Sequence, residues 1–170
     1  MIIIWVRHGR VDKKSRGADL LKKSGLDFAN RLPDILEKAG FHPQMVFIDI
    51  SKKKNGQSIE RCEKTVAKLF ERFGPPLRYD YTNKDGRIII DKCNDYDTAL
   101  ICYTSESLKY FPKIKGAICE DYMGNPHCQK APREITDRLY ENIIISEYNG
   151  NEIRQIATIE TGELQKRVTH

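Results

Sequence analysis

The residues best suited to chemistry follow the first apolar run of the chain, where residues 2–6 (IIIWV) lead directly into Arg7, His8 and Gly9. Apolar, β-branched and aromatic residues without alternation are typical of a buried central strand. Ligands bind at the carboxyl ends of strands in open α/β sheets. A histidine there, beside a permanently charged arginine and a glycine that lets backbone approach a ligand, predicts an anion site. The alternative is a surface loop with an incidental histidine, which the tripeptide alone leaves open.

The cysteines raise a second chemistry, metal binding, which their spacing does not favour. The chain has five cysteines, an odd number, and no C-x-x-C pair. Cys119, His127 and Cys128 come closest to a metal cluster, but adjacent His-Cys is not the usual zinc spacing and no fourth ligand is evident. We therefore expect no metal site and no disulfide framework, which is typical of a reduced intracellular protein.

The elements that must position these residues alternate between strands and helices. Expected strands cover residues 2–6, 44–50, 87–91, 98–103, 142–148 and 151–159. Expected helices cover residues 17–39, 59–73 (with Ser58 as N-cap), 105–111 and 135–141. Pro33 is expected to kink or split the first helix. The alternation predicts an α/β fold, a three-layer sandwich with a mainly parallel central sheet flanked by helices and a C-terminal antiparallel hairpin at the edge.

Beyond the tripeptide, several segments resemble the histidine phosphatase superfamily, which includes cofactor-dependent phosphoglycerate mutases and small phosphohistidine phosphatases. Residues 7–9 match its strand-end R-H-G motif, and residues 61–65 (RCEKT) resemble its R-A-x-Q-T segment. Residues 21–29 (LKKSGLDFA) resemble the family's L-T-x-x-G-x-x-Q-A helix start, and residues 99–103 stand where it has a V-L-V-V-S-H-G strand. The final hairpin is similar to the closing strands, so we expect one histidine-phosphatase-like domain over residues 1–170.

The resemblance implies a phosphatase that works in two steps. Neutral His8 attacks phosphorus and forms a phosphohistidine, which water then hydrolyses. Arg7 and Arg61 hold the phosphoryl oxygens bidentately and neutralise charge in the transition state, so neither a metal nor another cofactor is expected. Two nearby arginines also oppose protonation of His8, which keeps it nucleophilic near neutral pH.

Departures from the family pattern concern the catalytic machinery. The family's second histidine falls at Thr104, whose hydroxyl offers a neutral hydrogen bond to the phosphoryl group; losing one such donor typically costs about 10²–10³ in rate. His127 is the histidine that could replace it. The pattern does not identify a general acid, and Glu106 and Asp80 are candidates from chain position alone. The short segment between residues 73 and 98 lacks the mutase insertion, which argues against mutase activity.

Other departures make the rim of the expected pocket more basic. Arg10 stands where the family usually has an acidic residue, Lys14 stands where asparagine is common, and a lysine-rich insertion spans residues 52–56. The two interpretations are a solvated basic face and a site adapted to a polyanionic ligand.

Composition limits the classes of function. The chain has 170 residues, of which 39% are hydrophobic and 31% charged, with a net charge of +5. This length fits one globular domain. The apolar runs are far shorter than the roughly 20 residues of a membrane span. No signal peptide is evident, so we expect a cytoplasmic protein with no membrane partner.

The expected partner is a phosphorylated small molecule or a phosphoprotein. The first alternative is a phosphate-binding module, weakly catalytic or inactive, and Thr104 is the feature that favours it. A nucleic-acid or polyanion binder ranks last, because aromatic residues are not interleaved with the basic residues that it would use. Those basic residues are Lys13, Lys14, Arg16 and residues 52–54.

Overall fold

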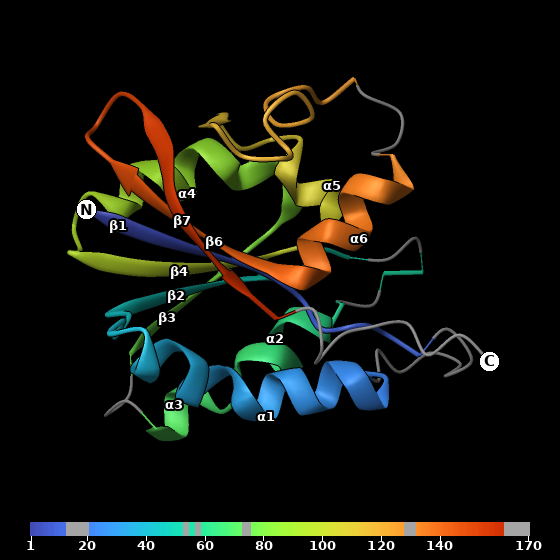
Figure 1. The fold of residues 1–170 in the computed structure, drawn as a ribbon. Coiled ribbons are helices and arrows are strands. Elements are labelled where there is room, and N and C mark those ends of the chain that lie inside the picture. Colours follow the sequence, from blue (N-terminus) through green and yellow to red (C-terminus); the bar gives the residue numbers. More distant parts are fainter. Residues whose placement is uncertain (13–20, 53–54, 57–58, 73–75, 128–131, 162–170) are drawn as a thin grey trace.

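The first strand and the elements beside it build a mixed sheet, seen in the computed structural model of the chain (Figure 1). The structure describes residues 1–12, 21–52, 55–56, 59–72, 76–127 and 132–161. The strands are β1 (Ile2–Arg7), β2 (Met45–Asp49), β3 (Leu77–Tyr81), β4 (Thr98–Tyr103), β5 (Ile114–Lys115), β6 (Asn142–Tyr148) and β7 (Ile153–Glu160).

The sheet has the strand order β3-β2-β4-β1-β6-β7-β5. Strands β3, β2, β4 and β1 run parallel to one another, and β6 runs antiparallel to both β1 and β7. The hairpin of β6 and β7 therefore lies toward one edge, with the short β5 beyond it. This arrangement confirms the expected α/β sandwich with a mainly parallel sheet and a C-terminal antiparallel hairpin.

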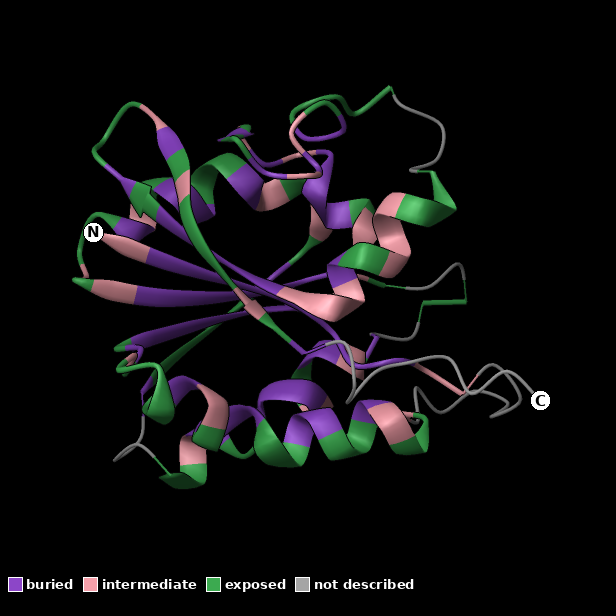
Figure 2. Ribbon diagram, in the orientation of Figure 1, coloured by how far each residue is buried: buried purple, intermediate pink, exposed green. Residues whose placement is uncertain are grey.

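Alternating side chains of the buried strands face two separate cores, so the sheet is the middle of three layers. Ile3 and Trp5 of β1 belong to one core, and Ile4 and Val6 belong to the other. On the second face lie α1 (Lys23–Lys38), α2 (Arg61–Val66) and α3 (Leu69–Arg72). On the first face lie α4 (Gly86–Cys93), α5 (Ser105–Leu108) and α6 (Arg133–Glu141). Figure 2 shows the buried strands between these two layers.

The strand expected over residues 87–91 is wrong, because these residues form α4, after the short 3₁₀ helix Asn83–Asp85. The run of isoleucines has high β propensity, but its buried positions follow a helical period: Gly86, Ile89 and Cys93 face the core while Ile88 is 53% exposed. Packing against the sheet outweighs the intrinsic preference of β-branched residues.

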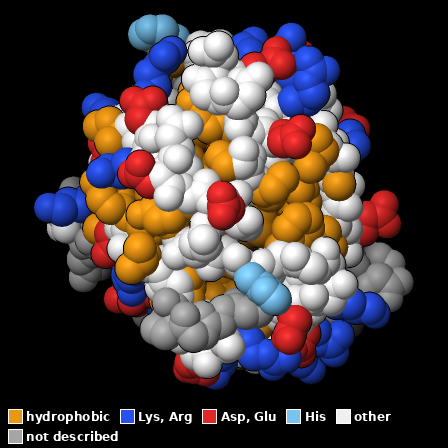
Figure 3. Space-filling view, turned by 90° about the vertical axis from the view of Figure 1, so that its left-hand side faces the viewer, with side chains coloured by type: hydrophobic (Ala, Val, Ile, Leu, Met, Phe, Trp, Pro, Cys, Tyr) orange, Lys and Arg blue, Asp and Glu red, His pale blue; other side chains and the backbone are white. Residues whose placement is uncertain are grey.

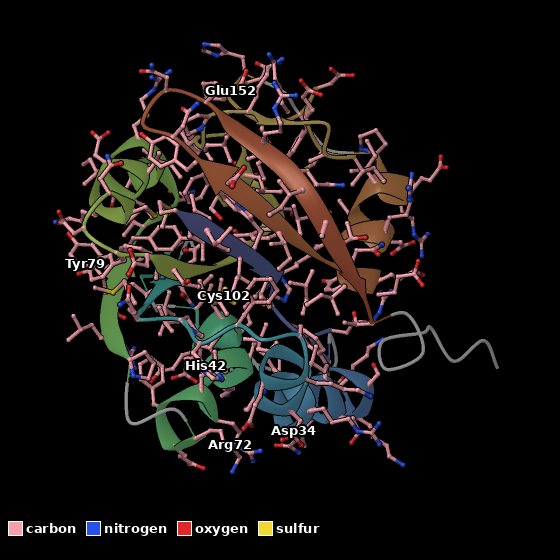
Figure 4. All side chains as sticks on the ribbon, turned by 60° about the vertical axis from the view of Figure 1, so that its left-hand side comes forward. Asp34, His42, Arg72, Tyr79, Cys102 and Glu152 are labelled. Atoms are coloured by element: carbon pink, nitrogen blue, oxygen red, sulfur yellow. The ribbon has the colours of Figure 1, made fainter. Side chains whose placement is uncertain are left out.

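The edge strand β3 was not expected. Its residues are mostly exposed, and Tyr79 lies on the outer side of the sheet (Figure 4). Because β3 lies at the edge of the sheet and is largely polar, its sequence has no apolar run that would predict a strand. Its backbone is nevertheless paired in parallel with β2 along its whole length.

Two helix expectations also need correction. The helix expected over residues 59–73 is two short helices, α2 and α3, and Ser58 lies outside the described residues. Helix α1 is one element that includes Pro33, so of the two expected effects of Pro33, a kink or a split, the split does not occur. Arg72 of α3 contacts Asp34 of α1 at 2.8 Å (Figure 4), which ties the two helices together. Among helices of the described segments, none has both the length and the hydropathy needed to cross a membrane.

Candidate functional site

The R-H-G loop begins where β1 ends, beside the end of β4. The backbone N–H of His8 donates to the carbonyl of Tyr103 at 3.2 Å, which continues the parallel pairing of Arg7 with Tyr103. His8 and Thr104 therefore leave two neighbouring strands side by side, at a strand spacing of about 4.8 Å. The carboxyl end of the sheet thus brings together two positions that the sequence analysis selected separately.

The imidazole of His8 is fixed in one tautomer by its own loop. The ring is buried, at 2% exposure, and Nδ1 lies 2.7 Å from the carbonyl oxygen of Gly9. A carbonyl oxygen can only accept, so Nδ1 carries the hydrogen of this bond. In the neutral ring, Nε2 then holds the lone pair. The hydrogen bond thus prepares Nε2 to act as a nucleophile or as an acceptor.

Helix α1 packs against the loop through two glycines. A Cβ atom on Gly9 would lie 2.8 Å from the carbonyl oxygen of Gly25, and one on Gly25 would lie 2.5 Å from the carbonyl oxygen of Arg10. Neither site has room for a side chain. Lys22 also donates its backbone N–H to the Arg10 carbonyl at 2.7 Å. Close backbone contact therefore explains the glycine that residues 21–29 share with the family motif.

Helix α2 is tied to the same loop through Thr65. The backbone N–H of Gly9 donates to Thr65 Oγ1 at 2.8 Å, and that hydroxyl donates to the carbonyl of Arg61 at 2.7 Å. Arg61 is the first residue of α2 and lies one helical turn before Thr65. The hydroxyl thus ties the first turn of α2, which begins with Arg61, to the R-H-G loop.

The Arg7 side chain turns toward α6. It is 8% exposed, its Nη1 donates to the carbonyl of Thr136 at 2.5 Å, and its Cζ lies 3.8 Å from the centroid of the Tyr140 ring. Burial lowers the pKa of Arg7 from its ordinary value, opposed mainly by Tyr140 and Tyr103. The Nε atom is buried without a hydrogen-bond partner in the described part of the chain. It is a donor that an oxyanion would satisfy.

Helix α6 covers this site with residues that the sequence analysis missed. The Cζ of Arg10 lies 4.3 Å from the Tyr140 ring centroid, and Arg10 pairs with Asp137 at 3.7 Å. The ring of Tyr140 also meets that of His8 edge to face, with centroids 5.6 Å apart. Tyr140 therefore contacts both guanidinium groups and the imidazole. No spacing signal links a helix so late in the chain to the first loop.

Thr104 is held by a buried carboxylate that was also missed. Its Oγ1 donates to Asp49 Oδ2 at 2.9 Å and accepts from the backbone N–H of Ser107 at 3.1 Å, which caps α5. Asp49 is the last residue of β2 and is completely buried. An acidic residue at the end of an apolar strand is the signal that could have found it, because such a residue is costly to bury.

The two candidate acids lie in different surroundings. Glu106 of α5 follows Thr104 by two residues; its side chain is 55% exposed and contacts Lys109 at 3.0 Å. Asp80 of β3 contacts Arg78 at 2.7 Å on the exposed edge of the sheet. His127, the candidate replacement for the second histidine, is exposed.

The remaining predicted features concern metal and charge. Cys119 is buried, Cys128 lies outside the described residues, and no group of three or more metal-ligating side chains occurs in the described ranges. Lys14 and the basic residues 13–16 and 53–54 are likewise not described. The face in Figure 3 has hydrophobic side chains near its middle and charges of both signs around its rim.

No protein-family model matches the chain, and no curated protein sequence matches it. Among solved structures, the fold is similar to that of the protein histidine phosphatase SixA complexed with tungstate, with a TM-score of 0.65, 11% identity, and coverage of 96% of this chain and 99% of that chain. Two proteins assigned as phosphohistidine phosphatase SixA each give a TM-score of 0.59. The one from Agrobacterium tumefaciens is 12% identical (93% and 97% coverage), and the one from Nakamurella multipartitia is 11% identical (94% and 95%).

These likenesses define the class of fold. The chain has the α/β fold of the SixA phosphohistidine phosphatases over nearly its whole length. Identities of 11–12% establish the fold alone, so the activity must be argued from the residues at the carboxyl end of the sheet.

Proposed function

We propose that this chain is a phosphatase of the histidine phosphatase type, which passes a phosphoryl group first to His8 and then to water. The observation that carries the proposal is the 2.7 Å hydrogen bond between His8 Nδ1 and the Gly9 carbonyl, because it leaves the lone pair on Nε2. The similarity to SixA folds supports the same reaction class.

The proposed reaction has two balanced steps. In the first, Nε2 of His8 forms a bond to phosphorus while the bond from phosphorus to the leaving group breaks, and the leaving group takes a proton from the general acid. In the second, water gives a proton back to the general acid and attacks the phosphohistidine, the N–P bond breaks, and inorganic phosphate leaves with His8 restored. Positioning and fixed positive charge supply the catalysis, so the proposed reaction does not require a metal or another cofactor.

Arg7 and Arg61 are the proposed phosphate-binding residues. Arg7 has a buried Nε–H without a partner among the described residues, and Arg61 begins the helix that Thr65 ties to the loop. Planar guanidinium groups match the oxygens of a tetrahedral oxyanion. The SixA structure that contains tungstate, a tetrahedral oxyanion, supports an oxyanion as the ligand of this fold.

Thr104 occupies the proposed position of the second histidine, next to His8. For the general acid we propose Glu106 ahead of Asp80, because Glu106 lies on the helix that Thr104 begins, whereas Asp80 is on the edge strand. The proposed substrate is a cytoplasmic phosphoprotein or a phosphorylated small molecule, handled by one domain over residues 1–170.

A phosphate-binding module is the second candidate, and Thr104 is the observation that favours it. The Thr104 hydroxyl gives its proton to Asp49, so it does not replace the charged donor of a second histidine. If this loss dominates, the chain binds phosphate with little turnover.

The test is hydrolysis of an aryl phosphate by the parent chain, His8→Ala and His42→Ala. His42 is exposed and follows α1, in the connection from that helix to β2 (Figure 4), so it serves as the matched histidine control. We expect turnover and an acid-labile phosphoryl adduct on the His8 peptide, both lost only in His8→Ala. Activity that persists in His8→Ala contradicts the mechanism, and tungstate binding without turnover in the parent chain favours the binding module.

A further inference from the structure

Asp49 is a buried carboxylate for which the proposed reaction has no use. It is completely buried at the end of β2. Its oxygens accept from the Thr104 hydroxyl at 2.9 Å and from the backbone N–H and hydroxyl of Ser51, at 2.8 and 2.5 Å. Every donor that reaches it among the described residues is a neutral group. A carboxylate that only neutral donors reach, in the described part of the chain, is costly to bury, which points to a role beyond packing.

The hydrogen-bond directions around this carboxylate are fixed by its neighbours. The Ser51 hydroxyl oxygen accepts from the backbone N–H of Asn83 at 2.8 Å, so its own proton is free to go to Asp49. The Thr104 hydroxyl oxygen accepts from the Ser107 N–H, and its proton goes to Asp49 Oδ2 at 2.9 Å, the nearer and charged acceptor, rather than to Ser107 Oγ at 3.3 Å. Each hydroxyl has only one proton, and both are used.

The charge of Asp49 reaches the proposed phosphate site. It raises the pKa of the buried Cys62 thiol, together with the larger effect of burial, while nearby Arg61 lowers that pKa. Asp49 and Arg61 thus act on the same neighbour with opposite sign. Thr104, whose hydroxyl hydrogen-bonds directly to Asp49, lies beside His8 at the strand ends.

We propose that Asp49 is a positioning residue that turns the Thr104 hydroxyl proton away from the oxyanion and adds a negative charge behind it. The site then discriminates against doubly charged oxyanions in favour of singly charged ones. Where the family resemblance places a cationic donor, this chain has an oxygen with its proton committed elsewhere and a carboxylate behind it. The inference rests on the proposed oxyanion site.

The experiment compares two tetrahedral anions of similar size, tungstate with a double negative charge and perrhenate with a single one. Their affinities for the full chain are measured by calorimetry for the parent, Asp49→Asn and Asp91→Asn. Asp91 is an exposed carboxylate on α4 and controls for net charge. An asparagine can donate to Thr104 Oγ1 and release its proton toward the ligand. We expect Asp49→Asn to raise the tungstate-to-perrhenate affinity ratio about tenfold, with Asp91→Asn unchanged.

A purely structural role for Asp49 predicts a different result, in which Asp49→Asn weakens both anions equally; that result, or an unchanged ratio, overturns the inference. If Asp49→Asn does not fold, Asp49→Ser also removes the negative charge behind Thr104 and is expected to shift the ratio in the same direction. In a Thr104→Val background the effect of Asp49→Asn should shrink, because the hydroxyl it acts through is gone. A full effect there contradicts the positioning role.

The failure of the inference and that of the proposed function are distinguishable. If the parent chain binds neither anion, the oxyanion site and the inference fail together. If the parent binds both anions and loses them in His8→Ala, but Asp49→Asn leaves the ratio unchanged, only the inference fails.

Discussion

The Arg7 guanidinium has one nitrogen, Nη1, that is hydrogen-bonded and another, Nε, that is not. Its Nη1 is held by the Thr136 carbonyl and its plane lies on Tyr140, while the buried Nε–H has no partner in the described segments. A buried donor without a partner costs about 1–3 kcal/mol. A bound oxyanion would recover that cost. The Arg7 guanidinium is therefore preorganised for an oxyanion, because its rotamer is fixed and its Nε–H can still donate a hydrogen bond.

Tyr140 is the residue that fixes this rotamer, which leads to the first prediction. A guanidinium over an aromatic ring gains about 0.5–1 kcal/mol at exposed sites and more when buried, and Tyr140 stacks with both Arg7 and Arg10. We expect Tyr140→Leu to weaken tungstate binding about fivefold, measured by calorimetry. Tyr140→Phe keeps the ring and is the matched control. Equal losses in the two variants would assign the effect to the hydroxyl and contradict the stacking argument.

The sequence pointed to Arg7 and His8 through their place after a strand and to Arg61 and Thr104 through the family resemblance, but it missed Tyr140 and Asp49. Arg7 and His8 are recognisable because they directly follow an apolar strand. Tyr140 carries no local pattern, because it lies on an amphipathic helix among similar residues. Asp49 has a local signal, since it is an acidic residue at the end of an apolar strand, but that signal does not show which side chain it contacts. Their roles depend on long-range contacts, which residue spacing does not encode.

At the scale of elements, the position of α1 is set by close backbone contact with the R-H-G loop that it covers. Gly25 of α1 lies against Arg10 with no room for a Cβ atom, because that Cβ atom would lie 2.5 Å from the backbone carbonyl oxygen of Arg10. Both partners are backbone, so neither can rotate away. The start of α1 and the R-H-G loop must therefore move apart if a side chain is added.

This contact gives the second prediction. We expect Gly25→Ala to lower the free energy of unfolding by about 1–3 kcal/mol, the usual cost of overpacking, and to weaken tungstate binding as the loop shifts. Gly40→Ala is the control, because Gly40 has φ +84° and open space around it, at the other end of the helix. That variant should lose about 1 kcal/mol through strain without a change in affinity. Urea denaturation and calorimetry give both quantities, and intact affinity in Gly25→Ala would contradict the argument.

The same scale shows where element prediction succeeds. The buried strands β1, β2 and β4 and the hairpin of β6 and β7 lie where expected, because burial on both faces or a clear turn gives a strong local signal. The segment of α4 was assigned wrongly because its isoleucine run favours a strand, whereas packing requires a helical face. The polar edge strand β3 could not be found, because only its pairing with β2 defines it.

Across the whole molecule, the core contains several groups that can ionise only with difficulty. Burial raises the pKa of Cys93 and of Cys119 to about 12. Burial also raises the pKa of Cys62, Tyr81 and Tyr103 well above their ordinary values. These thiols and phenols belong to the two cores, so their pKa values are raised only when the sheet and its helices are folded together.

The third prediction follows from these raised values. Unfolded thiols lose their protons above about pH 9 and unfolded tyrosines above about pH 10, while the native state keeps them. The unfolded state therefore binds fewer protons, and the free energy of unfolding falls as pH rises above about 9, by up to about 1.4 kcal/mol per pH unit for each group. Below about pH 8 this contribution is complete and constant. Urea denaturation from about pH 7 to 10.5 measures the slope.

A variant separates this effect from a general loss of stability in alkali. Cys93→Ala removes one of the buried thiols, so its stability at neutral pH falls, but its loss between about pH 9 and 10.5 should be smaller than that of the parent by up to about 1.4 kcal/mol per pH unit. Cys93 is suitable because burial raises its pKa, with no charged neighbour in the described part of the chain that the substitution would disturb. Parallel curves for the two proteins would mean that surface charge, and not the protonated core, sets the alkaline limit of this fold.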